Sequence, residues 1–190
     1  MSGWTDTVVS DLGRWQADRV ARRLRHCGLD AVYSSPLLRA RATARAILGA
    51  NGTARLVLAP GLREIFCGVV DGCSVDEVRT AHPGFWRRNA VQEDCDFRWP
   101  GGESYRAFRD RCVATVDAVA RRHPGGRALV VTHAGVISQL VGSIEKVSPA
   151  RWEQFRPGNA SVSVLEWGGA HPRVLAFDHR SHLDALAAAG

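Results

Sequence analysis

Hydrophobic positions along the chain follow two patterns in turn, a helical one and a strand-like one. Four apolar residues at i, i+3, i+4 and i+7 predict a helix over about residues 11–26, and Gly28 is typical of the position after a helix. Similar spacing predicts further helices from Ser35-Pro36 to Asn51-Gly52, from Ser104 to about residue 123, and from the end of a strand to about Ile144. Short apolar runs predict strands at 30–33, 55–59, 128–132, 161–167 and 173–177.

This alternation of strands and helices predicts an α/β fold, a three-layer α/β/α sandwich with a mainly parallel sheet. The run at 128–132 is the clearest pattern of a buried strand, and the last two strands are expected to form a hairpin at the sheet edge. A length of 190 residues fits one domain over 1–190. Between residues 60 and 103, Ser74 and Glu77 predict a capped short helix. The aromatic group of Phe85, Trp86, Phe97 and Trp99 is interpreted as part of a lid over a substrate pocket.

Composition and charge exclude some classes of protein. No apolar run approaches the length of a membrane span and no signal peptide is visible, so a cytoplasmic protein without a membrane partner is expected. Lys and Arg number 25 against 19 Asp and Glu, but Lys146 is the only lysine and the arginines are scattered. This pattern favours the codon bias of a GC-rich genome over a nucleic-acid surface, and it leaves a small anionic substrate open.

Cysteine and histidine usage predicts neither disulfides nor a metal site. The chain has five cysteines, an odd number, and no two of them are spaced as C-x-x-C. We therefore expect reduced thiols. His171, His179 and His182 lie near the C-terminus with two aspartates, but a mobile polar tail is the preferred interpretation. We therefore expect no metal and no cofactor.

Three polar residues follow three of the predicted strands. His133 follows the strand at 128–132, Arg39 lies one turn into the helix after the strand at 30–33, and Glu64 follows the strand at 55–59. Ligands of parallel sheets bind at the carboxyl ends of the strands, so these side chains are candidates for one site. Taken singly, each is more often structural, but together an imidazole, a guanidinium and a carboxyl suit phosphoryl chemistry.

Six segments in order along the chain resemble the histidine phosphatase, or phosphoglycerate mutase-like, superfamily. They are Asp11-Leu12-Gly13 with Gln16-Ala17, Tyr33–Ala40 with Thr43-Ala44, Leu62-Arg63-Glu64 with Gly68, Pro100–Ser104, Val131–Gly135 and Asn159–Val162. The resemblance implies that Arg39, His133 and the Ala134 amide bind phosphate and that Glu64 protonates the leaving group. A phosphatase that acts on a small phosphorylated molecule is expected rather than a mutase.

The family's nucleophile, a histidine in an Arg-His-Gly motif after the first strand, has no match here. Arg25-His26-Cys27 is interpreted as a helix end, because it lies downstream of where the motif belongs. The resemblance therefore implies that the first strand is missing, which would leave its neighbours facing a gap. Three explanations are open for the missing strand. Either the sequence starts downstream of the natural start or is truncated, or the sheet has closed up, or another chain supplies the strand.

Two functions follow from these expectations. The first is hydrolysis of a small-molecule phosphate monoester, which this polypeptide would need a nucleophile to perform. The alternative is a diverged family member that binds an anionic small molecule or uses His133 and Glu64 for acid–base chemistry without a phosphoenzyme. A homodimer is left open, and the sequence does not indicate which substrate is used.

Overall fold

The computed structural model describes residues 1–51, 55–169 and 171–186 of the chain. Its helices are α1 (Asp11–Arg23), α2 (Leu38–Asn51), α3 (Val75–Ala81), α4 (Pro83–Val91), α5 (Tyr105–Arg122) and α6 (Ala134–Ile144). Its strands are β1 (Ala31–Ser34), β2 (Leu56–Leu58), β3 (Ala128–Val131), β4 (Val162–Glu166) and β5 (Arg173–His179). Short 3₁₀ helices lie at η1 (Pro60–Leu62), η2 (Gly68–Val70), η3 (Pro149–Phe155) and η4 (Ser181–Leu186).

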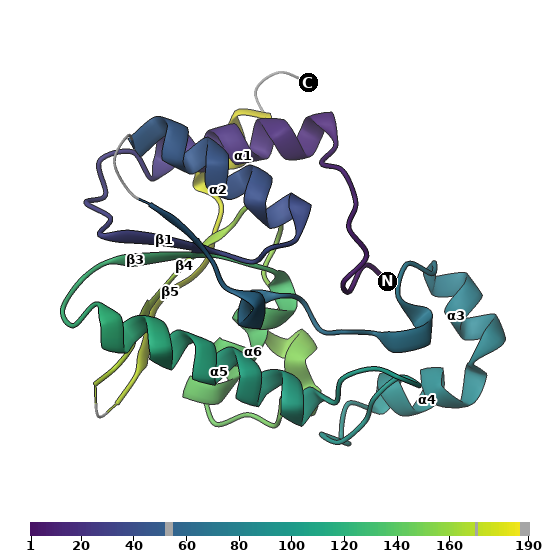
Figure 1. Cartoon of the computed structure of the whole chain (residues 1–190). Coiled ribbons are helices and arrows are strands. Elements are labelled where there is room, and N and C mark those ends of the chain that lie inside the picture. Colours follow the sequence, from purple (N-terminus) through teal and green to yellow (C-terminus); the bar gives the residue numbers. More distant parts are fainter. Residues whose placement is uncertain (52–54, 170, 187–190) are drawn as a thin grey trace.

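A parallel sheet lies between two layers of helices, as the sequence predicted (Figure 1). The strand order is β2-β1-β3, with α1 and α2 over one face and α5 and α6 over the other. Ser34, the last residue of β1, is in register with Leu58 of β2 and Val131 of β3. The carboxyl ends of the three strands therefore meet at one edge of the sheet, which is where ligands bind in folds of this kind.

A hydrophobic core fills each side of the sheet. Val20, Ala44 and Ile47 of α1 and α2 pack on one face. On the other face, α5 buries the same apolar residues that its sequence pattern predicted, Tyr105, Phe108, Cys112, Val116 and Val119. Each buried Val, Ile or Phe side chain contributes about 1.5–3 kcal/mol to folding. These two cores fix the sheet edge on which the polar residues lie.

The strands of the described residues form two separate sheets. Strands β4 and β5 form the predicted hairpin, but they make a separate antiparallel sheet rather than an edge of the parallel one. In the described residues β3 pairs with β1 alone. Val131 is buried and the other three residues of β3 are half-buried, so the prediction of a buried strand holds only at its end. The second backbone edge of β3 has no strand against it among the described residues, which lets solvent approach this end of the sheet.

Several helix ends differ from the sequence predictions by a turn or less. Helix α1 ends at Arg23 rather than near His26. Helix α2 begins at Leu38 rather than at Pro36, because the Asp6 carboxylate accepts the Leu38 amide at 2.6 Å and so caps the helix from the N-terminal segment. Helix α2 ends at Asn51, and Gly52 lies outside the described residues. The capping box at the start of α3 is confirmed.

The segment before α5 carries a third apolar core. Phe97, Trp99 and Tyr105 are buried beside Val78, beneath α3 and α4, which project from one side of the sandwich (Figure 1). The aromatic group is therefore largely a core and not an open stacking surface. That α3 and α4 cover a substrate pocket stays a prediction.

The polar C-terminal segment, interpreted from the sequence as a mobile tail, contains the strand β5 and the 3₁₀ helix η4. Helix η4 packs on α1, and the Arg19 Nε donates to the His182 carbonyl at 3.0 Å. Residues 187–190, three alanines and a glycine, lie outside the described residues. No group of three metal-binding side chains is found in the part of the chain that the structure describes.

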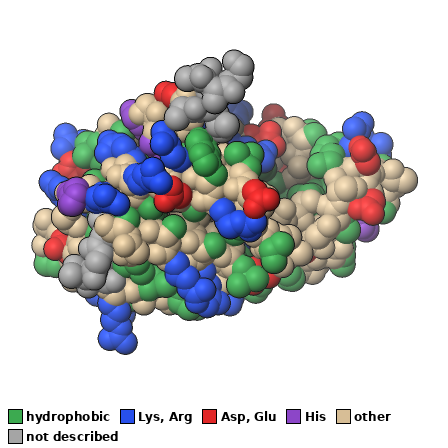
Figure 2. All heavy atoms as spheres, turned by 90° about the horizontal axis from the view of Figure 1, so that it is seen from above, with side chains coloured by type: hydrophobic (Ala, Val, Ile, Leu, Met, Phe, Trp, Pro, Cys, Tyr) green, Lys and Arg blue, Asp and Glu red, His purple; other side chains and the backbone are tan. Residues whose placement is uncertain are grey.

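Charge on the surface is mixed. On the face in Figure 2, arginine side chains are spread over the body of the molecule with acidic side chains among them. Most of the ion pairs lie on the surface, and two of them join neighbouring turns of α1. No helix within the described ranges is long and apolar enough to cross a membrane. Cys67 and Cys112 are buried thiols, and none of the five cysteines forms a disulfide in the described chain.

Candidate active site

His133 and Arg39 meet at the carboxyl edge of the sheet. His133 follows β3 and is the N-cap residue of α6, and its side chain is buried. The Arg39 Nε donates to the His133 Nδ1 at 3.3 Å, and the His133 Nε2 lies 2.8 Å from the Ser35 Oγ. The structure thus brings together two residues that the sequence placed after different strands.

The surroundings of His133 keep its imidazole neutral. Burial, followed by the positive charges of Arg39 and Arg111, lowers the pKa of His133 to about 3. A neutral imidazole can donate one hydrogen bond and accept another, and here both ring nitrogens have partners. A bound anion beside Arg39 would oppose these charges and favour the protonated ring.

Glu64 reaches the same edge from the turn after η1. Its Oε1 accepts the Ile65 amide at 2.9 Å and its Oε2 accepts the Gly135 amide at 3.1 Å, in the first turn of α6. Burial raises the pKa of Glu64 above its ordinary value of 4.5, against the lowering effect of those two amides and of Arg39. A carboxyl group with a raised pKa is suited to act as a general acid.

Gly135 is what allows the carboxyl group to lie against α6. A Cβ added at this position would lie 2.1 Å from the Glu64 Oε1, far inside van der Waals contact. The sequence singled out Gly135 only as part of a motif. Its role in admitting Glu64 comes from the close approach of two segments that are distant along the chain.

The N-terminal segment accepts three further hydrogen bonds from Arg39. Its Nη1 donates to the Thr5 carbonyl at 2.9 Å, and its Nη2 donates to the carbonyls of Gly3 at 2.8 Å and Ser2 at 3.4 Å. Trp4, between them, donates its indole N–H to the Glu64 carbonyl at 2.8 Å. The sequence did not predict these contacts, since backbone carbonyls leave no residue-specific signal.

The backbone amide of Ala134 and the hydroxyl group of Ser35 also lie beside His133. Ala134 is the first residue of α6, beside His133, so its amide lies at the helix N-terminus, where anions are favoured. Ser35 was assigned as a helix cap, and its hydroxyl does accept the Leu37 amide at 3.3 Å, but its contact with His133 was missed. His26 is exposed with a positive φ of 67° after α1, away from these contacts.

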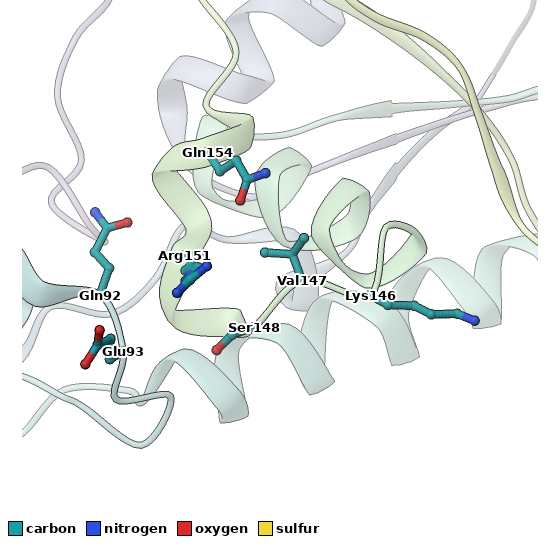
Figure 3. Close-up of a pocket in the computed structure, with 7 residues that line it drawn as sticks. All are labelled: Gln92, Glu93, Lys146, Val147, Ser148, Arg151 and Gln154. Atoms are coloured by element: carbon teal, nitrogen blue, oxygen red, sulfur yellow. The ribbon is translucent and has the colours of Figure 1, made fainter.

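A separate cavity of about 460 Å³ lies beside η3 (Figure 3). Its lining is polar and of mixed charge: Gln92, Glu93, Lys146, Val147, Ser148, Arg151 and Gln154. The Lys146 side chain extends away from the other labelled residues (Figure 3). None of these residues belongs to the group around His133, so the cavity is not the continuation of that site.

The fold and the site define an α/β protein that presents a buried imidazole, a guanidinium and a carboxyl group at one sheet edge. The chain belongs to the histidine phosphatase superfamily (branch 1), whose family model matches residues 1–179. This confirms the family that the six sequence segments indicated.

The relatives match nearly the whole of this chain and somewhat less of their own length. It is 32% identical to phosphoglycerate mutase-like protein 4 of Arabidopsis thaliana over 187 residues, which cover 97% of this chain and 80% of the relative. It is also 32% identical to a probable phosphoglycerate mutase GpmB of Enterobacter sp. (strain 638) over 192 residues, covering 98% and 88%.

Solved structures share the fold. Bacillus stearothermophilus YhfR has a TM-score of 0.88 and 26% identity, with 96% of this chain and 90% of that one covered. The native structure of a mycobacterial glucosyl-3-phosphoglycerate phosphatase has a TM-score of 0.84 and 28% identity, covering 95% and 91%. Phosphatase and mutase-like proteins are therefore its relatives.

Proposed function

We propose that the protein hydrolyses a small-molecule phosphate monoester at the edge that carries His133. The observation that carries the proposal is the contact of Arg39 with His133, beside a carboxyl group whose pKa is raised. Arginine binds phosphate oxygens with a planar fork of donors, and the Ala134 amide at the start of α6 adds a further donor. Relatives named as phosphatases support the same class of reaction.

Each residue has a distinct part in the proposed reaction. Arg39, His133 and the Ala134 amide bind the phosphate and stabilise its charge as the bond to the ester oxygen breaks. A water molecule forms the new bond to phosphorus as the bond to the ester oxygen breaks. Glu64 gives its proton to the leaving oxygen and takes one from the attacking water, whose oxygen ends in inorganic phosphate. The protein is proposed to work as one domain over 1–190 in the cytoplasm, without metal or cofactor. A homodimer is left open.

The alternative function is anion binding, or acid–base chemistry by His133 and Glu64, without a phosphoenzyme. Two observations favour it. No second imidazole contacts Arg39, Glu64 or His133 in the described residues, and the carbonyls of Gly3 and Thr5 already hold the Arg39 guanidinium. An incoming phosphate would have to replace part of those hydrogen bonds.

Phosphate release from a generic aryl phosphate separates the two functions. Turnover that falls at least 100-fold in His133→Ala supports the hydrolase, since one charge-stabilising group is worth about 100–1000-fold in kcat. Binding of inorganic phosphate that Arg39→Ala abolishes, with no turnover in either protein, supports the alternative. Affinity for nucleic acid that falls steeply with salt would contradict both.

A further inference from the structure

Arg111 and Glu103 form an ion pair beside the turn that carries Glu64. Arg111 lies on α5 and Glu103 lies just before it, and their side chains are 22% and 17% exposed. The Arg111 Nε donates to the Glu103 Oε1 at 2.9 Å, and its Nη2 donates to Oε2 at 2.7 Å. A two-point contact of this kind fixes the plane of the guanidinium as well as its position.

The other donors of Arg111 all go to backbone carbonyls of the Glu64 turn. Nη1 donates to the carbonyls of Gly61 at 2.7 Å and Arg63 at 3.0 Å, and Nη2 also donates to the carbonyl of Glu64 at 3.2 Å. With the two bonds to Glu103, the five N–H groups of the guanidinium are all used. Lysine has three donors without a fixed plane, so it could not reproduce this set.

Glu103 holds the far end of the same turn. Its Oε2 accepts the Phe66 amide at 3.4 Å, and its own amide donates to the Phe66 carbonyl at 2.9 Å. The pair therefore contacts the chain before, at and after Glu64. Between η1 and η2 this stretch has no helix or strand of its own to fix its course.

The position of this turn decides where the Glu64 carboxyl group lies. The carboxyl group reaches the Gly135 amide at 3.1 Å, and a shift of about 1 Å in a reacting group can cost about 100-fold in rate. We propose that Arg111 and Glu103 are positioning residues that hold the Glu64 turn so that its carboxyl group lies at the start of α6. This inference rests on the proposed function, in which Glu64 is the acid.

Arg111→Lys tests the inference, with Arg106→Lys as its matched control. Arg106 lies on the same helix and pairs with Asp96 through two donors, but it makes no contact with the Glu64 turn. We expect kcat for an aryl phosphate to fall at least about 10-fold in Arg111→Lys, with KM and the Kd for inorganic phosphate changed less than about 2-fold. Arg106→Lys should leave all three unchanged. A purely structural role would lower stability without this split.

A second measurement does not depend on turnover. The titration of the Glu64 carboxyl group, followed by carbon NMR in the whole chain, should move toward 4.5 in Arg111→Lys, because the group leaves its buried place. If no variant, including the wild type, releases phosphate, the proposed function fails while this titration still decides the positioning role. An unchanged titration, or an unchanged kcat in an active protein, would overturn it. Should Arg111→Lys not fold, Glu103→Gln removes the two-point contact and carries the same measurements.

Discussion

The Nε of Arg39 donates a hydrogen bond to the Nδ1 of His133 across 3.3 Å, so this nitrogen carries no proton in the described state. The proton of the neutral ring is then on Nε2, which lies 2.8 Å from the Ser35 hydroxyl oxygen. One guanidinium thus determines which tautomer of the imidazole is present. The relationship also explains why Arg39 contributes to the low pKa of His133, since a protonated ring would face a positive charge at this distance.

Binding of inorganic phosphate is expected to raise the pKa of His133. In the free protein that pKa is about 3, so the ring stays neutral throughout the usual pH range. A phosphate dianion bound beside Arg39 would offset the positive charge and favour protonation of His133. Proton-detected nitrogen NMR of the imidazole, recorded from pH 4 to 8 with and without phosphate, measures the shift.

Arg39→Ala should raise the pKa of His133 in the free protein and remove the effect of phosphate. An ordinary pKa of about 6.5 for His133 in the wild type would contradict the buried geometry.

Stability should fall as pH falls below 6.5, and His133 should be one cause. The folded pKa of His133 is depressed to about 3, so between pH 6.5 and 3 the unfolded chain binds one proton more than the folded protein. The free energy of unfolding then falls by about 1.4 kcal/mol per pH unit from this group. Urea unfolding between pH 6.5 and 4.5 should show a shallower loss in His133→Gln than in the wild type.

Glu64 acts in the opposite direction. Its folded pKa is raised above 4.5, so the folded protein holds the proton longer, and stability from this group is lost as pH rises through the window between 4.5 and that pKa. Glu64→Gln should remove this loss, which the same urea series measures. Equal slopes for the wild type and both variants would show that neither group is buried as described.

The fold could be predicted from the sequence where side-chain periodicity is strong. The five inward residues of α5 were identified because one helix face is apolar throughout. The half-covered state of β3 could not be identified, because Ala128, Leu129 and Val130 have the same composition whether one or two strands pair with them. Pairing is a property of the whole sheet, and only the family resemblance indicated a break in it.

The site was predicted in part for a similar reason. His133, Arg39 and Glu64 could be placed together because the ends of parallel strands meet at one edge. Ser35, Gly135 and Arg111 could not, because their roles depend on which segments approach closely across the fold. The Gly135–Glu64 contact joins residues 71 positions apart, and no spacing rule connects them.

Gly135→Ala should displace Glu64. The added methyl group would lie 2.1 Å from the Glu64 Oε1, so the carboxyl group would have to leave the Gly135 amide. We expect phosphate release to fall about 10-fold or more and stability to fall by about 1–3 kcal/mol, as for other overpacked sites. Gly49→Ala on α2 is the control, because a Cβ there has no atom within 4 Å and should stabilise the helix by about 0.5–1 kcal/mol. Equal behaviour of the two variants in the phosphate assay would contradict the contact.

Asp6 links the N-terminal segment to the helix that carries Arg39. Its Oδ1 accepts the Leu38 amide at 2.6 Å, at the start of α2, where a carboxylate also interacts favourably with the helix dipole. Asp6→Ala should lower the free energy of unfolding by about 1 kcal/mol, whereas Asp6→Asn keeps an acceptor and should lose only part of this.

Because Arg39 lies one residue after Leu38 and is held by the carbonyls of Gly3 and Thr5, Asp6→Ala should also change the Kd for inorganic phosphate, measured by calorimetry. Asp11, which is exposed and pairs only within α1, gives the matched control Asp11→Ala, and its Kd should equal that of the wild type. A Kd that changes equally in Asp6→Ala and Asp11→Ala would mean that the N-terminal segment affects the site through net charge alone and not through the position of Arg39.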